Sequence, residues 1–253
     1  MQTAKQKLKR AAPWLFLLLV LAGLAAVRGL AANYEIGYEI MNGDFQNYNP
    51  VRHLLAGQIP YRDFTVYLGA GELYSVGGLL LVLGNSFGRS MFATNFCTWF
   101  YFELLVLAVC LVVIGTARAA RAAALALCSV FFAYVQGANL PFAGQVNTLL
   151  SYAAANGNSA RMMRSAALTL AVLVILLGLH FWQQDTSRRL LAPAVLVPFA
   201  AGFFVPWSND MGGAAYISIA LGYGLYLIRL YRSSIGKIVV QTLRYIVTSV
   251  VGL

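Results

Sequence analysis

The segment VYLGAGELYSVGGLLLVLG, residues 66–84, decides the fold, because every later loop changes sides of a membrane if this segment crosses one. It has the length and apolar content of a transmembrane helix, but it also contains several glycines and one glutamate, Glu72. Glycine weakens a helix, and a charged residue inside a bilayer is costly. The segment therefore either crosses the membrane or lies at its surface, and the rest of the chain has to discriminate between the two.

The composition is typical of a membrane protein with several spans. Of the 253 residues, 60% are hydrophobic and 10% are charged, whereas soluble domains carry about 25% charged residues. Apolar runs of about 20 residues, long enough to cross a bilayer, recur along the chain. We attribute the formal net charge of +10 to Lys and Arg in cytoplasmic loops rather than to nucleic-acid binding.

The expected fold class is all-α: a polytopic helical membrane protein with about seven spanning helices and a non-spanning helix in the first extracytoplasmic loop, residues 34–90. Residues 1–253 are interpreted as a single transmembrane domain. Because no polar flank follows the last apolar segment, we expect the chain to be the N-terminal part of a longer protein. The apolar segments are 13–33, 66–84, 91–116, 121–139, 166–182, 190–207, 211–228 and 238–253.

The positive-inside rule discriminates between the two alternatives for residues 66–84. Four cations within the first ten residues place the N-terminus in the cytoplasm. If residues 66–84 do not span, the cytoplasmic side holds twelve Lys and Arg and the outer side five; if they span, the counts become seven and ten. We therefore expect a non-spanning segment in a protein of the plasma (inner) membrane of a bacterium. The first loop and the turn PWSNDMGG, residues 206–213, then share the extracytoplasmic side.

The most polar run of the chain, NGDFQNYNPVRHLLAGQIPYRDF at residues 42–64, lies in the first loop. It resembles the first-loop pattern of the GT-C superfamily of membrane glycosyltransferases, in which an acidic residue precedes a short helix ending in LLxGxxPYRDF. LGNSFGRSMFATNF is similar to the family's step into the next helix, and TARAARAAALAL to the basic cytoplasmic turn that follows. The superfamily includes protein mannosyltransferases and bacterial aminoarabinose transferases, and the resemblance covers roughly residues 10–140.

The resemblance implies an enzyme that moves a sugar from a polyprenyl-phosphate donor to a glycan, lipid or protein acceptor of the cell envelope. The family places a catalytic carboxylate early in the first loop, where this chain has Asp44. Such a carboxylate takes the acceptor's proton, and cations or a metal offset the charge on the departing phosphate. Some members carry an acidic motif in the second external loop that residues 139–163 lack, so a divalent metal stays an open cofactor and no metal ligand is assigned. The alternative role for Asp44 is the N-cap of the loop helix.

Other polar residues on the same side are candidates for substrate binding. The turn residues combine an aromatic face with hydrogen-bonding groups that suit a sugar, although Asn-Asp-x-Gly-Gly is also ordinary turn chemistry. Arginines at the outer ends of helices suit a lipid phosphate, the alternative being contact with headgroups. Asp63 either joins the site, pairs with Arg62 or Arg52, or caps the next helix. The candidates are Asp63, Arg62, Arg52, His53, Trp207, Asn209, Asp210, Arg161 and Arg164.

A second class of function stays open: a non-enzymatic lipid or solute transporter, a flippase-like protein, or an inactive fragment. Transporters favour inverted repeats and charges near the bilayer midplane. This chain shows no evident repeat, and its acidic residues cluster in the first loop, which favours the enzyme. Membrane lipids are expected partners in either case.

Two charges and three cysteines fall inside apolar segments. Arg28 and Glu103 are interpreted as structural, because intramembrane charges usually face the protein interior. Cys97, Cys110 and Cys128 lack metal-ligand spacing and are expected to be small buried hydrophobic residues.

Overall fold

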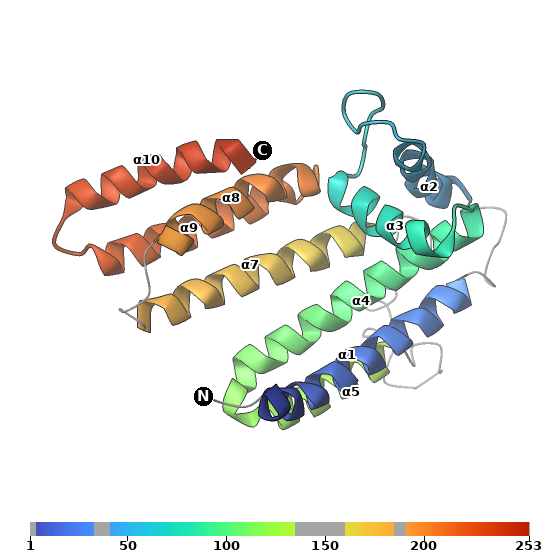
Figure 1. The fold of residues 1–253 in the computed structure, drawn as a ribbon, viewed down its shortest axis with the longest axis horizontal. Coiled ribbons are helices and arrows are strands. Elements are labelled where there is room, and N and C mark those ends of the chain that lie inside the picture. The colour runs from blue at the N-terminus through green and yellow to red at the C-terminus, as the bar shows by residue number, and fades with distance from the viewer. Residues whose placement is uncertain (1–3, 33–40, 135–159, 185–190, 253) are drawn as a thin grey trace, which may run out of the picture.

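The computed structural model describes residues 4–32, 41–134, 160–184 and 191–252. Within these ranges the chain is helical apart from turns and loops, which confirms the all-α prediction. Each of the eight predicted apolar segments coincides with a helix, and the predicted loop helix is α2 (Figure 1). The helices are α1 (Ala4–Ala32), α2 (Met41–Leu55), α3 (Ala70–Leu83), α4 (Phe87–Ile114), α5 (Ala119–Tyr134), α7 (Ala160–Gln184), α8 (Leu191–Trp207), α9 (Gly212–Leu230) and α10 (Ile235–Gly252).

The architecture is that of a polytopic helical membrane protein. Four of the described helices are long and apolar enough to cross a membrane: α1 over Ala11–Leu30, α4, α9 and α10. Helices α3, α5, α7 and α8 contain shorter apolar stretches. Many large apolar side chains are exposed along these helices, as expected where lipid rather than water is the solvent.

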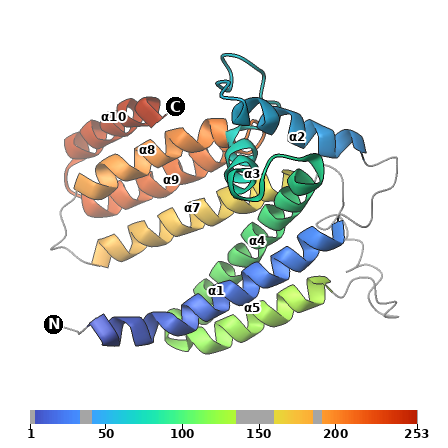
Figure 2. The same ribbon diagram turned by 45° about the vertical axis from the view of Figure 1, so that its right-hand side comes forward.

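Helices α1 and α4 run antiparallel. Leu17 belongs to one hydrophobic cluster with Leu107, whereas twelve residues further along α1 a side chain on Gly29 would touch the ring of Phe92. Residue numbers therefore rise along α1 as they fall along α4, and the end of α1 lies beside the start of α4 (Figure 2). Consequently the segment that joins them, including α3, begins and ends at the same end of the bundle.

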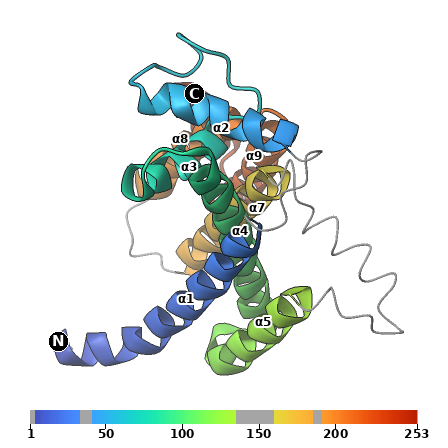
Figure 3. The same ribbon diagram turned by 90° about the vertical axis from the view of Figure 1, so that its right-hand side faces the viewer.

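Helices α2 and α3 lie together at this end, against the starts of α4 and α7 and the end of α8 (Figure 3). Helix α3 has 14 residues, which at 1.5 Å per residue gives about 21 Å, less than the roughly 30 Å of a bilayer's hydrocarbon core. Its apolar side chains pack between α2 and α4 in a core that also reaches α7. That core comprises Val51, Val66, Leu68, Leu73, Val76, Leu80, Ala93, Cys97 and Met163.

Helices α7 to α10 pack as a second group. Helices α8 and α10 lie close together at two glycines. A Cβ on Gly202 would overlap the carbonyl of Ser249, and a Cβ on Gly252 would overlap the carbonyl of Phe199. Small residues allow such close approach between helices in membranes. The core of this group comprises Leu179, Val197, Ala201, Ile219, Tyr223, Tyr226, Leu227 and Tyr245.

The charges and cysteines within the apolar helices occupy different environments. The guanidinium of Arg28 lies 4.7 Å from the centroid of the Trp99 ring, across the contact of α1 with α4. Glu103, one turn beyond Trp99 on α4, is fully buried.

Cys97 and Cys110 are buried as predicted. Cys128 is exposed, so the prediction that it is buried was wrong. Helix α5 is apolar on most of its surface, so its sequence does not show which face other helices cover.

Candidate functional site

The loop between α2 and α3 folds back onto the turn between α8 and α9. The Asn209 side-chain amide donates hydrogen bonds to the carbonyl oxygens of Val66 and Tyr67, at 3.0 and 2.8 Å. The Tyr61 hydroxyl lies 3.4 Å from the Asn209 Oδ1 atom and 3.5 Å from the carbonyl oxygen of Pro206. Two segments that are about 140 residues apart therefore form one surface at the end of the bundle.

Two glycines allow this close contact. Gly69 has a φ of +104°, and a Cβ on it would lie 2.5 Å from the carbonyl oxygen of Trp207. A Cβ on Gly71 would overlap the indole ring of Trp207. Only glycine adopts such a backbone conformation readily and leaves room for the neighbouring chain. The start of α3 is thus seated directly against the end of α8.

A buried arginine from α7 reaches the same place. The Nη1 atom of Arg164 donates to Oδ1 of Asp210 at 2.9 Å and to the carbonyl oxygen of Leu68 at 3.4 Å. The Arg164 side chain is 5% exposed, whereas that of Asp210 is 59% exposed. Arg164 therefore ties α7 to both the first loop and the α8–α9 turn, with its charge neutralised from the solvent side.

The carboxylate of Asp210 is stabilised in its ionised form. Partial burial acts to raise its pKa, but the Ser208 hydroxyl, which donates to Oδ1 at 2.5 Å, and the charge of Arg164 outweigh that effect. The pKa of Asp210 is consequently held below its usual value. At neutral pH the pair is ionic.

Next to the ion pair, a buried carboxyl group and a buried amide line a small cavity. Glu72 and Asn47 are each 3% exposed, and the cavity between them and the backbone of residues 66–69 has a volume of about 10 Å³. Within the described part of the chain, Glu72 Oε1 and both amide atoms of Asn47 lack hydrogen-bond partners. Burial raises the pKa of Glu72 to about 8, even though the charge of Arg164 acts to lower it. Glu72 is therefore mostly protonated at neutral pH, and the cavity has room for about one water molecule.

Four of the predicted site residues meet in this region: Trp207, Asn209, Asp210 and Arg164. Asp63 and Arg62 do not join them. The two form an exposed pair of their own, with Arg62 Nε 2.8 Å from Asp63 Oδ1, and Asp63 also accepts a hydrogen bond from the backbone N–H of Ile59. Asp63 therefore closes the loop turn with Arg62, one of the two partners foreseen for it.

Arg52 and His53 also serve the loop's own structure. Arg52 donates to Oδ1 of Asn49 at 3.0 Å on the same helix. The His53 ring stacks on Phe64, with centroids 5.3 Å apart, and bonds to the side chain of Gln58. The His53 contacts hold the loop against α2, and neither residue contacts the Arg164–Asp210 pair through a hydrogen bond that the structure shows among the described residues.

The side chains of Asp44 and Arg161 lie outside the described residues, although the helices that carry them do not. Asp44 is the fourth residue of α2, so the helix begins before it, whereas the capping alternative places Asp44 just ahead of the helix. It precedes Asn47 by about one helical turn, and Arg161 precedes Arg164 by about one turn of α7. The backbone thus carries both residues to the edge of the same site.

Sequence reasoning missed two members of the site. Glu72 was expected on the same side as the turn at residues 206–213 but was given no role, and Asn47 was not considered. A lone glutamate in an apolar, glycine-rich segment was the available signal for Glu72, since such a charge is rarely placed there without a purpose. Asn47 carried no signal, because its burial depends on α3 and the loop that cover it.

The site offers a buried guanidinium, an ionised carboxylate, a neutral carboxyl group and a buried amide. Among the described residues no cluster of His, Cys, Asp and Glu is arranged to hold a metal ion. The chain matches no protein-family model, no curated protein and no solved structure. The chemistry of these groups, together with the loop that covers them, is therefore the basis for assigning a function.

Proposed function

We propose that this chain is the membrane domain of a glycosyltransferase of the GT-C type. It would move a sugar from a polyprenyl-phosphate donor to an acceptor of the cell envelope, on the extracytoplasmic side. The observation that carries the proposal is the buried Arg164, held by Asp210 beneath the polar first loop. The resemblance of residues 10–140 to that superfamily agrees with it.

The proposed topology has seven crossing helices, with α2 and α3 outside the hydrocarbon core. The antiparallel pairing of α1 with α4 supports it, because the chain then returns to the membrane at the face where it left. The short α3 supports it as well. Arg118 follows the end of α4, and Arg229, Arg232 and Lys237 lie around the turn that joins α9 to α10, at the other end of the bundle. This agrees with a cytoplasmic N-terminus in a bacterial inner membrane.

Arg164 is suited to the leaving group of this reaction. When the bond between the sugar and the phosphate breaks, negative charge builds up on the phosphate oxygens, and a positioned cation stabilises that charge. A guanidinium binds phosphate through paired N–H donors, and its interaction is stronger where water is excluded. Arg161, one turn earlier on α7, is the second cation that the proposal assigns to the phosphate.

Asp44 is the proposed general base. As the acceptor oxygen bonds to the anomeric carbon of the sugar, its proton passes to a carboxylate and the polyprenyl phosphate departs. Two other acidic residues that the structure describes in this region are committed elsewhere: Asp210 to Arg164, and Asp63 to Arg62 and the loop backbone. Glu72, with its pKa raised to about 8, is a hydrogen-bond donor rather than a base at neutral pH.

The test compares Asp44→Asn with Asp63→Asn in the full-length protein, reconstituted in liposomes with radiolabelled polyprenyl-phosphate sugars. We expect Asp44→Asn to slow transfer by at least about 100-fold, the usual effect of losing a general base. Asp63→Asn is the matched control, because it makes the same change in the same loop and we expect a rate within about threefold of wild type. Transfer by folded Asp44→Asn at the wild-type rate would show that Asp44 is not the base. Movement of lipid or solute without any sugar transfer would favour the transporter.

A further inference from the structure

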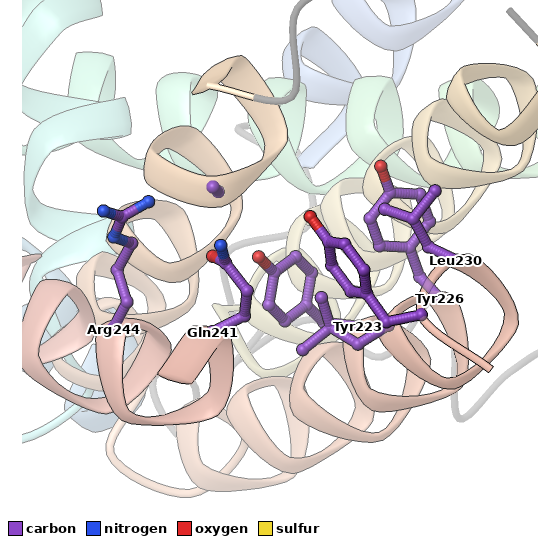
Figure 4. Close-up of a pocket in the computed structure, with 8 residues that line it drawn as sticks. Tyr223, Tyr226, Leu230, Gln241 and Arg244 are labelled. Atoms are coloured by element: carbon purple, nitrogen blue, oxygen red, sulfur yellow. The ribbon is translucent and has the colours of Figure 1, made fainter. Parts of the chain in front are cut away.

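A second cavity lies at the opposite end of the bundle from the first loop, between the start of α8, the last turns of α9 and the first turns of α10. Its volume is about 120 Å³. The polar side chains that line it are Tyr223, Tyr226, Tyr231, Gln241 and Arg244. Figure 4 shows Gln241 and Arg244 rising from α10 in the same direction, with the rings of Tyr223 and Tyr226 beside them.

Buried tyrosine rings form one wall of the cavity. Tyr223 and Tyr226 are 3% and 4% exposed, and Tyr223 stacks on Tyr245 of α10 with ring centroids 5.2 Å apart. Gln241 contributes an amide whose Oε1 atom is buried and, within the described residues, has no hydrogen-bond partner. The cavity thus holds a polar group that is ready to accept a hydrogen bond from a ligand.

The surroundings of the cavity are strongly positive. Residues 211–252 contain no Asp or Glu, and their four cations are Arg229, Arg232, Lys237 and Arg244. Lys237 lies over the ring of Tyr231, 5.9 Å from its centroid, and both residues line an open hollow that shares Gln241 with the cavity. No carboxylate of these two helices competes with an anionic ligand for the cations.

The position of the cavity points to a lipid. Helices α9 and α10 are both long and apolar enough to cross a membrane, and the cavity extends from the turn that joins them to about the middle of each helix. Apolar side chains are exposed on both helices at the level of the cavity and beyond it, among them Leu225 and Leu221 on α9 and Val247 on α10. A ligand with a charged head and apolar chains matches a positively charged cavity that adjoins exposed apolar side chains. Basic pockets between helices are known to bind lipid phosphates.

We propose that this cavity binds the headgroup of an anionic phospholipid, with Arg244 contacting the phosphate and Gln241 accepting a hydrogen bond from a headgroup hydroxyl. The site is separate from the proposed transferase site, at the other end of the bundle. It would hold the α9–α10 hairpin at the level of the lipid headgroups.

The experiment measures retention of phosphatidylglycerol by the full-length, detergent-purified protein, using native mass spectrometry over a lipid titration. Phosphatidylcholine and inorganic phosphate are titrated in parallel. We expect Arg244→Gln to weaken phosphatidylglycerol binding about tenfold, since it removes one charge-assisted contact. Arg118→Gln is the matched control, because it removes an exposed cation between α4 and α5, outside the cavity, and we expect less than a twofold change.

The other outcomes are decisive as well. Equal weakening by Arg118→Gln and Arg244→Gln would overturn the proposal in favour of diffuse attraction between the lipid and the cationic surface. Displacement of the lipid by millimolar inorganic phosphate would overturn the lipid assignment in favour of a free anion. If Arg244→Gln fails to fold, Gln241→Leu keeps the side-chain size without the amide. A weaker preference of Gln241→Leu for phosphatidylglycerol over phosphatidylcholine supports the site, and an unchanged preference overturns it.

Discussion

Replacing Asp210 by asparagine tests how much the ion pair between α7 and the α8–α9 turn stabilises the protein. The substitution removes the charge that neutralises Arg164, whose side chain is only 5% exposed. Leaving one member of a fully buried pair without its partner costs about 3–5 kcal/mol. Asp210 is itself 59% exposed, so water screens it, and the Leu68 carbonyl still accepts from Arg164. We therefore expect a loss of about 1–2 kcal/mol.

The assay is thermal unfolding of the full-length protein in one detergent, at low salt and pH 7. For a domain of this size the expected loss lowers the melting temperature by about 2–8 °C. Asp63→Asn provides the matched control, because Asp63 pairs with Arg62 at the surface, where the Arg62 side chain is 66% exposed. An exposed pair contributes little, so the control should melt with the wild type.

The pH dependence supplies a second readout. Because the pKa of Asp210 is lowered in the folded state, the pair stabilises the protein above the usual aspartate value of 3.8, and this contribution is lost as the pH falls through the lowered pKa. The melting temperatures of wild type and Asp210→Asn should therefore differ fully at pH 7 and converge in strong acid. Equal shifts for Asp210→Asn and Asp63→Asn, or a difference that does not change with pH, would refute the reasoning.

Three further predictions concern the same end of the molecule. Burial raises the pKa of Glu72 from 4.5 to about 8, so the stability of the protein should fall as the pH rises between these values. Glu72→Gln should abolish this dependence of stability on pH. A dependence that persists in the variant would contradict the view that Glu72 is buried in its protonated form. Gly69→Ala should destabilise the protein by more than about 1 kcal/mol in denaturant titrations. Gly78 has open space around it, so Gly78→Ala should stabilise the protein by about 0.5–1 kcal/mol. Similar effects of the two substitutions would mean that Gly69 does not contact α8. In a cysteine-free background, Ala56→Cys should react with an impermeant thiol reagent in intact cells, whereas Ala120→Cys should react only after permeabilisation. The reverse pattern would exclude the proposed topology.

Much of the fold was predictable because apolar runs of bilayer length are a local property of the sequence. The predicted segment at 66–84 coincides with α3 at Ala70–Leu83, and the loop helix appears as α2. The face of each helix that is covered was not predictable. Cys128 shows why: its helix is apolar on most sides, so nothing in the pattern of residues marks the side that packs.

The candidate site was also predictable only in part. Arg164, Asn209, Asp210 and Trp207 could be nominated from residue type and from the side of the membrane that the charge distribution assigns to them. The roles of Asp63 and His53 could not be separated from theirs, because an aspartate or histidine in a polar loop has the same sequence signature whether it closes a turn or binds a ligand.

By itself, the sequence predicted an all-α membrane protein whose polar first loop and α8–α9 turn lie together. Composition and the distribution of Lys and Arg are sufficient for that, because the bilayer acts as a solvent on each segment separately. Only the tertiary structure decided that Arg164 pairs with Asp210, that the start of α3 is seated on Trp207 through Gly69, and that Glu72 is buried. These features depend on contacts between helices far apart in the chain, and such contacts follow from the shapes of packed side chains rather than from the pattern of any one segment.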